Sequence, residues 1–485
     1  MITYQDMEKK LNDGIRIEDF VNSAISSHTS SKEYQIAVEA DEYDRQMNPT
    51  IMNFVRMMYN STGNAVVDIT ASNNKICSNF FHRLNTQRNV YLLGNGVSFV
   101  DNKEVTIDQD TGVEVVTDKT KEFLGNHFDA DLKNAAYKAL IHGVCFGFFD
   151  HDRLRVYPIT EFVPLWDEYT GDLRAGIRFW RIDANKPLIA ILFEEDGYTK
   201  FKKEKGETMK MVEGKIGYIE NVTASTEGGI ESIDYSNYPG FPVVPLWGNS
   251  TKQSTLIGMQ GKIDAFDLIR SGFANDLDDC AEIYWIINGA NGMDASDVSD
   301  FMRKLKLNHI AQADGDQQIT PYTQEVPFQA RKEFLEEIRS GIYEDFGALD
   351  VHTIAAGSTN DHIEAAYQPM DEEADDFEYQ IIEFIQSILE LNGISDTPVF
   401  KRNRISNQAE LTQMILSAAE YLDEETILQK LPFVTTDEVS KILTQKLKEE
   451  TNQFEDDNPF GDDSDEGDEG EGQEPTEPTN EDEEE

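Results

Sequence analysis

The stretch LIGMQGKIDAFDLIRSGFANDLDD, residues 256–279, decides how the rest of the chain is interpreted. Its apolar residues recur at positions 256, 259, 263, 266, 273 and 277, a nearly heptad spacing that gives a helix one narrow apolar stripe. A second face carries polar side chains: Asp264, Asp267, Ser271, Asn275 and Asp278. At 1.5 Å per residue such a helix is about 36 Å long. We therefore predict a long helix that packs through its stripe and presents polar groups on another face.

The chain before this helix has the pattern of an α+β domain. Short runs separated by Asp-Gly, Thr-Gly and Glu-Gly-Gly turns fill residues 154–245, which predicts short strands in one α+β domain and not alternating βαβ units. The other elements expected here are helices at 17–26, 51–95 and 129–141, a polar loop at 26–34, a stop at Gly94 and Gly96, a hairpin at 97–120 turning at 110–112, and a strand at 143–152.

After the long helix the pattern becomes mainly helical. A second long helix is predicted to start after Pro327, and a loop containing Gly347 and Gly357 separates it from a third at 363–391. The remaining expected elements are a β-like run at 281–289, a short helix at 295–306, a polar turn at 313–318, and two or three short helices in 407–450 with a capping sequence at 435–438.

Charge restricts the class of protein. The chain has 92 acidic and 42 basic residues, a formal charge of −50, which argues against wrapping DNA through a Lys/Arg surface or adhering to anionic membranes. From Glu455 to Glu485 there are 17 acidic and no basic residues, so this tail is predicted to be disordered. It could act as a solubilising tail, as a docking tail for a basic partner, or as a weak calcium binder.

The motifs of common enzymes are missing from the sequence. There is no phosphate loop, Gly94-Asn95-Gly96 lacks the rest of a dinucleotide fingerprint, and the histidines form neither HExxH nor HxH. Cys145 and His142 lie in an apolar run, so we interpret them as a buried pair and not as a nucleophile with its base. We expect no catalytic residues, no metal and no cofactor. The three cysteines cannot build a disulfide framework, and no membrane span or secretory signal is expected.

The order of segments resembles the portal proteins of tailed bacteriophages, in particular those of long-tailed phages of Gram-positive hosts. Four stretches carry the resemblance: NNKICSNFFHRLNTQRNVYLLGNGVSF (73–99), ALIHGVCFGFFDHDRLRVYPITEFVPLWDEYTGDLRAGIRFWR (139–181), SGFANDLDDCAEIYWIINGAN (271–291), and the helical block from Arg402 to Glu450. It covers about residues 50–450. The acidic tail departs from the family pattern.

The resemblance implies a portal fold with a β-rich wing, long stem helices, a small α/β clip, a helical crown and the acidic tail. The implied segments are an N-terminal arm (1–50), wing (51–250), stem helix (251–280), clip (281–326), stem return helix (327–346), tunnel loop (347–361), long wing helix (362–393), crown (394–450) and tail (451–485).

It also implies roles for individual residues. Candidates to line a DNA channel are Asp264, Asp267, Asp278, Glu333, Glu336, Glu337, Glu344 and Asp345. The tunnel loop would contain Gly347, His352, Gly357, Ser358 and Asn360, and Tyr284 and Trp285 are candidate clip contacts. The channel acids could instead pair between subunits with Arg270, Arg331, Lys332 and Arg339.

On this resemblance the protein is a non-enzymatic, twelve-membered ring at one vertex of the virion, made in the bacterial cytoplasm. Double-stranded DNA would pass through the ring without sequence-specific binding. The implied partners are the terminase large subunit, a head–tail adaptor, and the major capsid and scaffolding proteins. Two other functions stay open: an acidic DNA mimic or chaperone-like binder of basic proteins, and another capsid or connector component.

Overall fold

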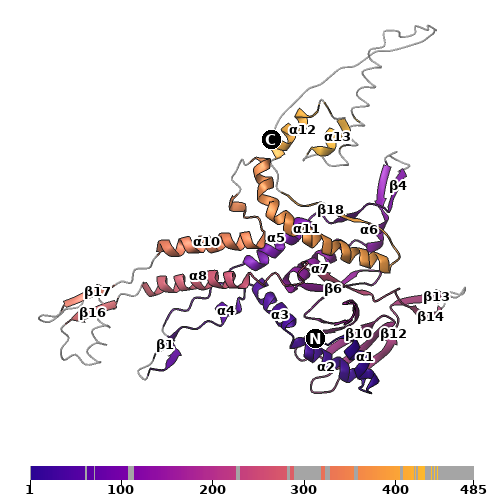
Figure 1. Ribbon diagram of the computed structural model, residues 1–485, viewed down its shortest axis with the longest axis horizontal. Coiled ribbons are helices and arrows are strands. Elements are labelled where there is room, and N and C mark those ends of the chain that lie inside the picture. Colours follow the sequence, from indigo (N-terminus) through magenta and orange to yellow (C-terminus); the bar gives the residue numbers. More distant parts are fainter. Residues whose placement is uncertain are drawn as a thin grey trace, which may run out of the picture. The chain divides into compact units, whose positions relative to one another are not determined.

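The computed structural model describes residues 2–59, 63–69, 71–107, 114–224, 230–280, 284–288, 318–322, 328–353, 359–404, 408–419, 421, 424–431, 439, 442 and 445. The chain divides into two compact units, Met1–Ile405 and Ser406–Glu485. Figure 1 shows the elements of each. The second unit begins one residue before the block of short helices predicted at 407–450.

Three helices open the first unit: α1 (Tyr4–Asn12), α2 (Ile17–Thr29) and α3 (Lys32–Asp44). The loop predicted at 26–34 is wrong for most of its length. Only two residues separate α2 from α3, because the Ser31 hydroxyl accepts a hydrogen bond from the Tyr34 amide (3.2 Å) and caps α3 immediately. Phe20 and Val21 of α2 are fully buried against the large sheet, so this segment is part of the domain core.

The strands are antiparallel, as the α+β prediction requires. A five-stranded meander joins β8 (Phe162–Trp166), β9 (Leu173–Trp180), β10 (Leu188–Glu194), β11 (Gly197–Lys203) and β12 (Lys210–Ile216). A smaller sheet has the order β15 (Val243–Trp247), β6 (Val144–Phe149), β7 (Leu154–Pro158). Two-stranded pairs are formed by β13 (Ile219–Ala224) with β14 (Ile230–Ser236) and by β4 (Lys103–Ile107) with β5 (Glu114–Asp118). The last pair is the predicted hairpin, whose turn at 110–112 lies outside the described residues.

Strand β6 joins two hydrophobic clusters because its side chains alternate between its faces. Cys145 and Phe149 pack with α7 (Phe128–His142) and with α11 (Asn360–Leu391), whereas Phe146 packs with residues of the five-stranded sheet. The short helix α6 (Lys119–Leu124) adds Leu124 to the first cluster. Helix α7 matches the prediction at 129–141 to within one residue at each end.

The helix predicted at 51–95 is mostly wrong. The segment contains α4 (Pro49–Met52), β1 (Met57–Tyr59) paired with β2 (Ala65–Val67), an extended stretch, and only then α5 (Phe80–Leu93). Apolar residues recur at helical spacing only near the end of this segment. The stretch before α5 is held extended by hydrogen bonds to side chains of α8, which are described below. Strand β3 (Val97–Phe99) pairs with β18 (Pro398–Phe400), a contact across three hundred residues that local pattern does not show.

The long helices have the predicted order. Helix α8 (Gln260–Cys280) starts later than predicted, after Gly258 with its positive φ of 91°. Then follow β16 (Tyr284–Asn288) paired with β17 (Gln318–Tyr322), α10 (Phe328–Phe346), the 3₁₀ turn η1 (Val351–Thr353) and α11. The predictions at 295–306, at 435–438 and for the tail lie outside the described residues, as does most of the turn at 313–318. The second unit contains α12 (Gln408–Ser417) and α13 (Glu424–Lys430), in line with the short helices expected there.

Candidate functional site

Helices α8 and α10 run side by side in opposite directions (Figure 1). Their contact is partly apolar, since the rings of Phe273 and Phe328 lie 5.7 Å apart. Charged side chains join the two helices at each end of their contact. Arg331 pairs with Asp276 at one end, and at the other the Lys262 ammonium donates to the Gly341 carbonyl (3.0 Å). Ile263 and Phe266 of the predicted apolar stripe also pack in one cluster with Ile342 and Phe346 of α10, whereas Leu277 of the stripe is exposed.

The polar face of α8 is covered by the segment between α3 and α5. Asp264 accepts hydrogen bonds from Tyr43 (2.5 Å), Asn48 (2.9 Å) and Thr50 (2.9 Å). About two turns further along, the Ser271 hydroxyl accepts from the Ile76 amide (3.0 Å).

The outer end of this face is bonded in the same way. The Asn275 side chain accepts from the Asn74 amide (2.5 Å), and Asp278 accepts from the Asn74 side chain (2.6 Å). All five polar residues singled out from the sequence, Asp267 included, therefore bind the chain between Tyr43 and Ser78, and we call this set of bonds the polar staple.

Asp267 is the most deeply buried member of the polar staple, with 0% of its surface exposed. It accepts from the Ser78 amide (2.8 Å) and from the Asn48 side chain (2.9 Å). Burial raises the pKa of the Asp267 carboxyl, an effect opposed by these hydrogen bonds and reinforced by the nearby Asp264 charge. Because its carboxylate is enclosed within one chain, Asp267 is not available to face a channel.

The acidic residues of α10 are placed differently. Every one of the predicted channel residues on this helix is exposed: Glu333, Glu336, Glu337, Glu344 and Asp345. At 100° per residue, the three at positions 333, 337 and 344 lie within about 40° of one another on one edge of the helix. That edge points away from Arg331, which contacts α8.

Two of the four cations expected to pair with these acids bind other carboxylates. Arg331 binds Asp276, and Arg339 binds Asp350 at 2.8 Å, both within the same chain. Lys332 lies 3.8 Å from Glu336, one turn away on the same helix, which is a weak surface pair.

The loop after α10 begins at Gly347, whose φ of 63° favours glycine. A Cβ added there would lie 2.8 Å from Cγ of Glu373 on α11, so the chain passes very close to that helix. His352 is exposed in η1. Asn360, predicted to lie in the loop, is instead the first residue of α11, because the preceding Thr359 caps that helix.

Four of the predicted tunnel-loop and clip residues are described only in part or not at all. Gly357 and Ser358 lie outside the described residues. Tyr284 and Trp285 belong to β16 and pair with Tyr322 and Pro321 of β17, but their side chains are outside the description.

Arg88 on α5 was missed by the sequence analysis, although it joins the start of this loop to α11. Its side chain is 7% exposed, donates to the Phe346 carbonyl at the end of α10 and lies 4.3 Å over the Phe346 ring. The same guanidinium pairs with Glu373 of α11 at 3.0 Å. Burial lowers the pKa of Arg88, and the Glu373 charge opposes that shift. One buried cation thus holds the end of one helix against another.

Two further arginines, Arg402 and Arg404, hold the chain after β18 against α11. Arg402 binds Asp371 (2.8 Å), Asp375 and Glu378 (3.0 Å), and Arg404 binds Asp371 at 2.6 Å. No sequence motif marks these contacts, because their partners are more than twenty residues away. Proline 369 lies inside α11, and Figure 1 shows this helix changing direction along its length.

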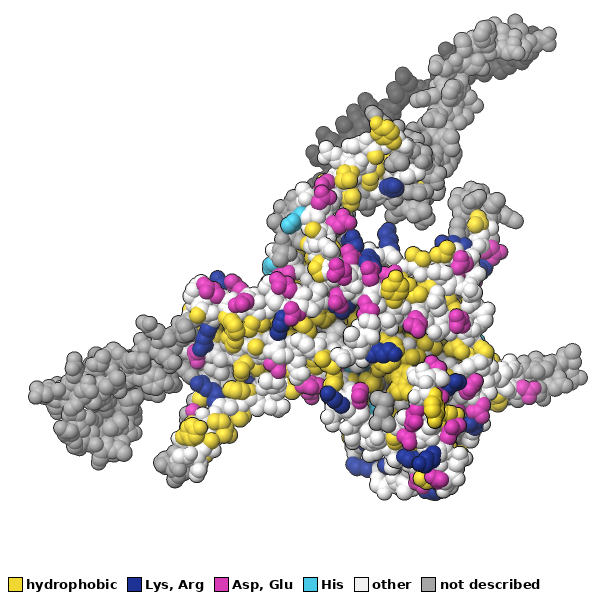
Figure 2. Space-filling view, in the orientation of Figure 1, with side chains coloured by type: hydrophobic (Ala, Val, Ile, Leu, Met, Phe, Trp, Pro, Cys, Tyr) yellow, Lys and Arg dark blue, Asp and Glu magenta, His cyan; other side chains and the backbone are white. Residues whose placement is uncertain are grey.

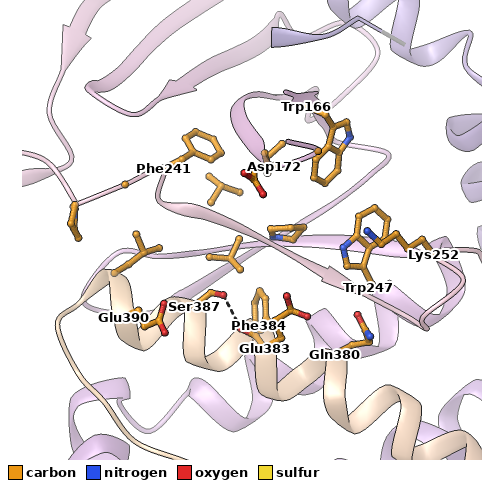
Figure 3. Close-up of a pocket in the computed structure, with 18 residues that line it drawn as sticks. Trp166, Asp172, Phe241, Trp247, Lys252, Gln380, Glu383, Phe384, Ser387 and Glu390 are labelled. Carbon is orange, nitrogen blue, oxygen red and sulfur yellow. Dashed lines mark hydrogen bonds between the residues drawn. The ribbon is translucent and has the colours of Figure 1, made fainter. Parts of the chain in front are cut away.

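A cavity of about 540 Å³ lies between α11 and β15 (Figure 3). Trp247 stacks on Trp166 with ring centroids 5.6 Å apart, and the Lys252 ammonium lies 4.5 Å over the Trp247 ring. Glu383 and Glu390 of α11 line the other side. Its lining contains no histidine or cysteine, so it offers no nucleophile–base pair of the kinds considered from the sequence.

The interpretation of Cys145 and His142 as buried residues is confirmed. The Cys145 thiol is fully buried and faces the Tyr157 carbonyl (3.4 Å), and burial raises its pKa to about 12. The His142 ring is fully buried 3.1 Å from Asp41. Among the described residues, no cluster of three or more His, Cys, Asp or Glu side chains could hold a metal ion, and no helix is long and apolar enough to cross a membrane.

Comparisons with known proteins identify the family. A family model described as phage portal protein, SPP1 Gp6-like, matches residues 46–453. The portal protein of Bacillus phage SPP1 is 24% identical over 428 residues, covering 82% of this chain and 80% of the relative. The portal protein of Clostridium phage phiCD119 is 24% identical over 416 residues, covering 80% and 88%.

A solved structure described as the neck of an empty GTA particle matches at 9% identity with a TM-score of 0.38, covering 72% of this chain and 88% of that one. The family match is the stronger finding, because it takes in nearly all of the first unit and continues into the second. The chain belongs to the SPP1 Gp6-like family of phage portal proteins.

Proposed function

We propose that twelve copies of this chain form a ring at one vertex of the capsid, and that double-stranded DNA passes through its axis during packaging and ejection. The observation that carries the proposal is the family match together with the antiparallel pair α8 and α10, which connects through the strands β16 and β17. In this assignment the pair is the stem, residues 281–326 are the clip, and the β-rich part of the first unit is the wing.

The channel wall in this proposal is the acidic edge of α10. Glu333, Glu337 and Glu344 share that edge and are exposed, and Glu336 lies beside it, whereas Asp345 pairs with Lys262 of α8. Like charges keep a polyanion from binding to the wall, whereas phosphate contacts would retard its movement. The Debye length of about 8 Å at physiological salt limits the repulsion to DNA near the wall. Asp264 and Asp278 contribute less, because the polar staple occupies them.

The remaining assignments follow the same arrangement. The tunnel loop at 347–359 would lie nearest the DNA, with Arg88 holding its base. The clip, with Tyr284 and Trp285, would dock the terminase large subunit and later the head–tail adaptor. The helical block in the second unit would be the crown, and the acidic tail would meet a basic segment of a scaffolding protein or repel packaged DNA. The major capsid protein would surround the ring in the virion.

The mass of the purified full-length protein tests the ring. We expect native mass spectrometry to show an assembly of about twelve or thirteen subunits, and electron microscopy to show a central hole. A monomer or dimer at every concentration would contradict the proposal.

The channel wall has its own test. Rings in which Glu333, Glu337 and Glu344 are changed to Gln should bind linear DNA several-fold more tightly at low salt, and the difference should shrink as salt is added. Rings with Asp13→Asn, Asp183→Asn and Glu195→Gln, three exposed acids near the five-stranded sheet, are the control for total charge. Equal binding by both variants would refute the assignment of this edge.

A further inference from the structure

The two-stranded hairpin β1–β2 leaves most of its apolar side chains exposed. We call residues 53–69 the projecting hairpin; its described parts are 53–59 and 63–69. Figure 2 shows hydrophobic side chains gathered along it, beside α8. The exposed ones are Phe54, Val55, Met57, Met58, Tyr59, Val67 and Ile69. Tyr59 is 80% and Ile69 90% exposed, so these side chains are not buried within the chain.

Such a hairpin is not stable alone in water, since an isolated pair of strands needs a further surface to cover it. Its base, in contrast, is firmly fixed. The polar staple binds Asn48 and Thr50 on the incoming side and Asn74 on the returning side. The hairpin is therefore presented in a defined position with its apolar side chains uncovered, as a surface prepared for a partner is.

Charge indicates what that partner is. The hairpin itself, residues 53–69, has one basic and one acidic residue, and the longer segment from Arg45 to Ser78 has three basic and one acidic, whereas the whole chain has a formal charge of −50. A neutral, apolar hairpin on a weakly basic base therefore meets no like-charge repulsion from another copy of this acidic protein. DNA is also acidic, but Met, Val and Ile side chains offer it no phosphate contact.

The α8–α10 pair has exposed apolar side chains of its own, and the hairpin is held beside the outer half of α8. The staple places the returning side of the hairpin at Asn275 and Asp278, the outer half of α8, and Phe273 contacts Phe328 in that half. Both helices carry exposed apolar residues: Leu277 is 54%, Phe328 57% and Phe334 46% exposed.

We propose that the projecting hairpin of one copy packs against the outer half of the α8–α10 pair of the next copy, over Leu277, Phe328 and Phe334. Different surfaces of each copy meet, so the contact is head-to-tail, and repeated contacts of this kind close into a ring. Rotation about an axis parallel to the helices keeps the hairpin at the level of these residues. This inference rests on the proposed ring and assigns one of its subunit contacts.

Replacement of the apolar tip tests the contact. Met57→Ser, Met58→Ser and Tyr59→Ser, made together, should raise the protein concentration at which half of the rings dissociate by about a hundredfold or more. The control is Tyr169→Ser with Ile182→Ser, two side chains that are 88% and 85% exposed on another part of the domain. The control should assemble as the wild type does, and both variants should keep the wild-type thermal unfolding of the first unit.

The outcomes separate the two proposals. If wild-type protein forms no ring, the proposed function fails. If wild-type rings form and the triple variant dissociates at the same concentration, the hairpin contact is refuted and the ring stands.

A photo-crosslinking residue at position 59 identifies the surface that the hairpin meets. In rings assembled from isotopically light and heavy copies, we expect mixed crosslinks to peptides of α8 or α10. Crosslinks only within one copy, only to other parts of the chain, or only to added DNA would overturn the proposal.

Discussion

Replacement of Arg88 by Met removes the cation that joins the end of α10 to α11. Methionine has a similar length and fills much of the same space, but it cannot donate to the Phe346 carbonyl or pair with Glu373. We expect Arg88→Met to loosen residues 347–353 before it affects the sheets, because both contacts lie at the base of this loop.

The magnitude follows from the surroundings of each contact. A hydrogen bond from a charged donor contributes about 1.5–3 kcal/mol, and a desolvated cation over a ring about 1–2 kcal/mol. The ion pair adds about 0–1 kcal/mol, since the Glu373 side chain is 49% exposed and regains water when its partner is lost. Burying the apolar methionine offsets about 1 kcal/mol. The net loss is therefore about 1.5–5 kcal/mol.

Amide hydrogen exchange measures this loss locally. The Ala348 amide donates to the Tyr343 carbonyl (2.9 Å), and its protection reports whether the end of α10 stays closed. A loss of 2 kcal/mol reduces protection roughly thirtyfold. Arg83→Met is the matched control, since Arg83 is an exposed arginine on the same helix.

One result would refute the reasoning. If Arg88→Met and Arg83→Met leave the exchange of residues 347–353 equally unchanged, Arg88 does not hold the loop. A loss of protection spread evenly over the whole first unit would also count against it, because that result describes a general core residue.

Three further predictions concern other parts of the domain. Gly347→Ala should destabilise the first unit by about 1–2 kcal/mol more than Gly393→Ala in urea unfolding, since both have positive φ but only the first would place a Cβ 2.8 Å from another side chain. Burial alone would raise the pKa of Asp371, but hydrogen bonds from Tyr91 and two arginines hold it below its usual value. The stability that Asp371 supplies is therefore present above about pH 4 and lost as the pH falls through the folded pKa. Asp371→Asn should make stability fall less at acidic pH, and a pH profile equal to that of the wild type would contradict the prediction. With the other cysteines changed to Ser, Cys145 should react with a thiol reagent at pH 8 only as fast as the protein unfolds, because burial raises its pKa to about 12.

The elements that local pattern specifies were predictable from the sequence. Helix α7, strand β6 and helix α10 agree closely with their predicted ranges, because each has a consistent apolar spacing and a clear boundary. The segment 51–79 was mistaken for helix, since the partners that hold it extended lie about two hundred residues later in α8. The pairing of strand β3 was unpredictable for the same reason, because its partner β18 is three hundred residues away.

Individual site residues were harder to predict than elements. An acidic side chain on a helix has the same sequence pattern whether it faces solvent, a channel or another segment. Asp267 and Glu337 were treated alike, yet one is fully buried and the other exposed. Arg88 could not be distinguished from Arg83, five residues earlier on the same helix, without knowledge of what packs over each.

The polar staple changes what the acidic charge of α8 means. Its carboxylates at 264, 267 and 278 accept hydrogen bonds from one segment of the same chain, so their first effect is to fix the base of the projecting hairpin. Helix α10 has no such cover over Glu333, Glu337 and Glu344, which are exposed together on one edge. The two helices thus have different roles in the proposed ring. Helix α8 holds the projecting hairpin that contacts the next copy, and α10 supplies the acidic wall of the channel. Neutralising acids on α8 should therefore weaken assembly, whereas neutralising those on α10 should leave the ring intact and change only how it meets DNA.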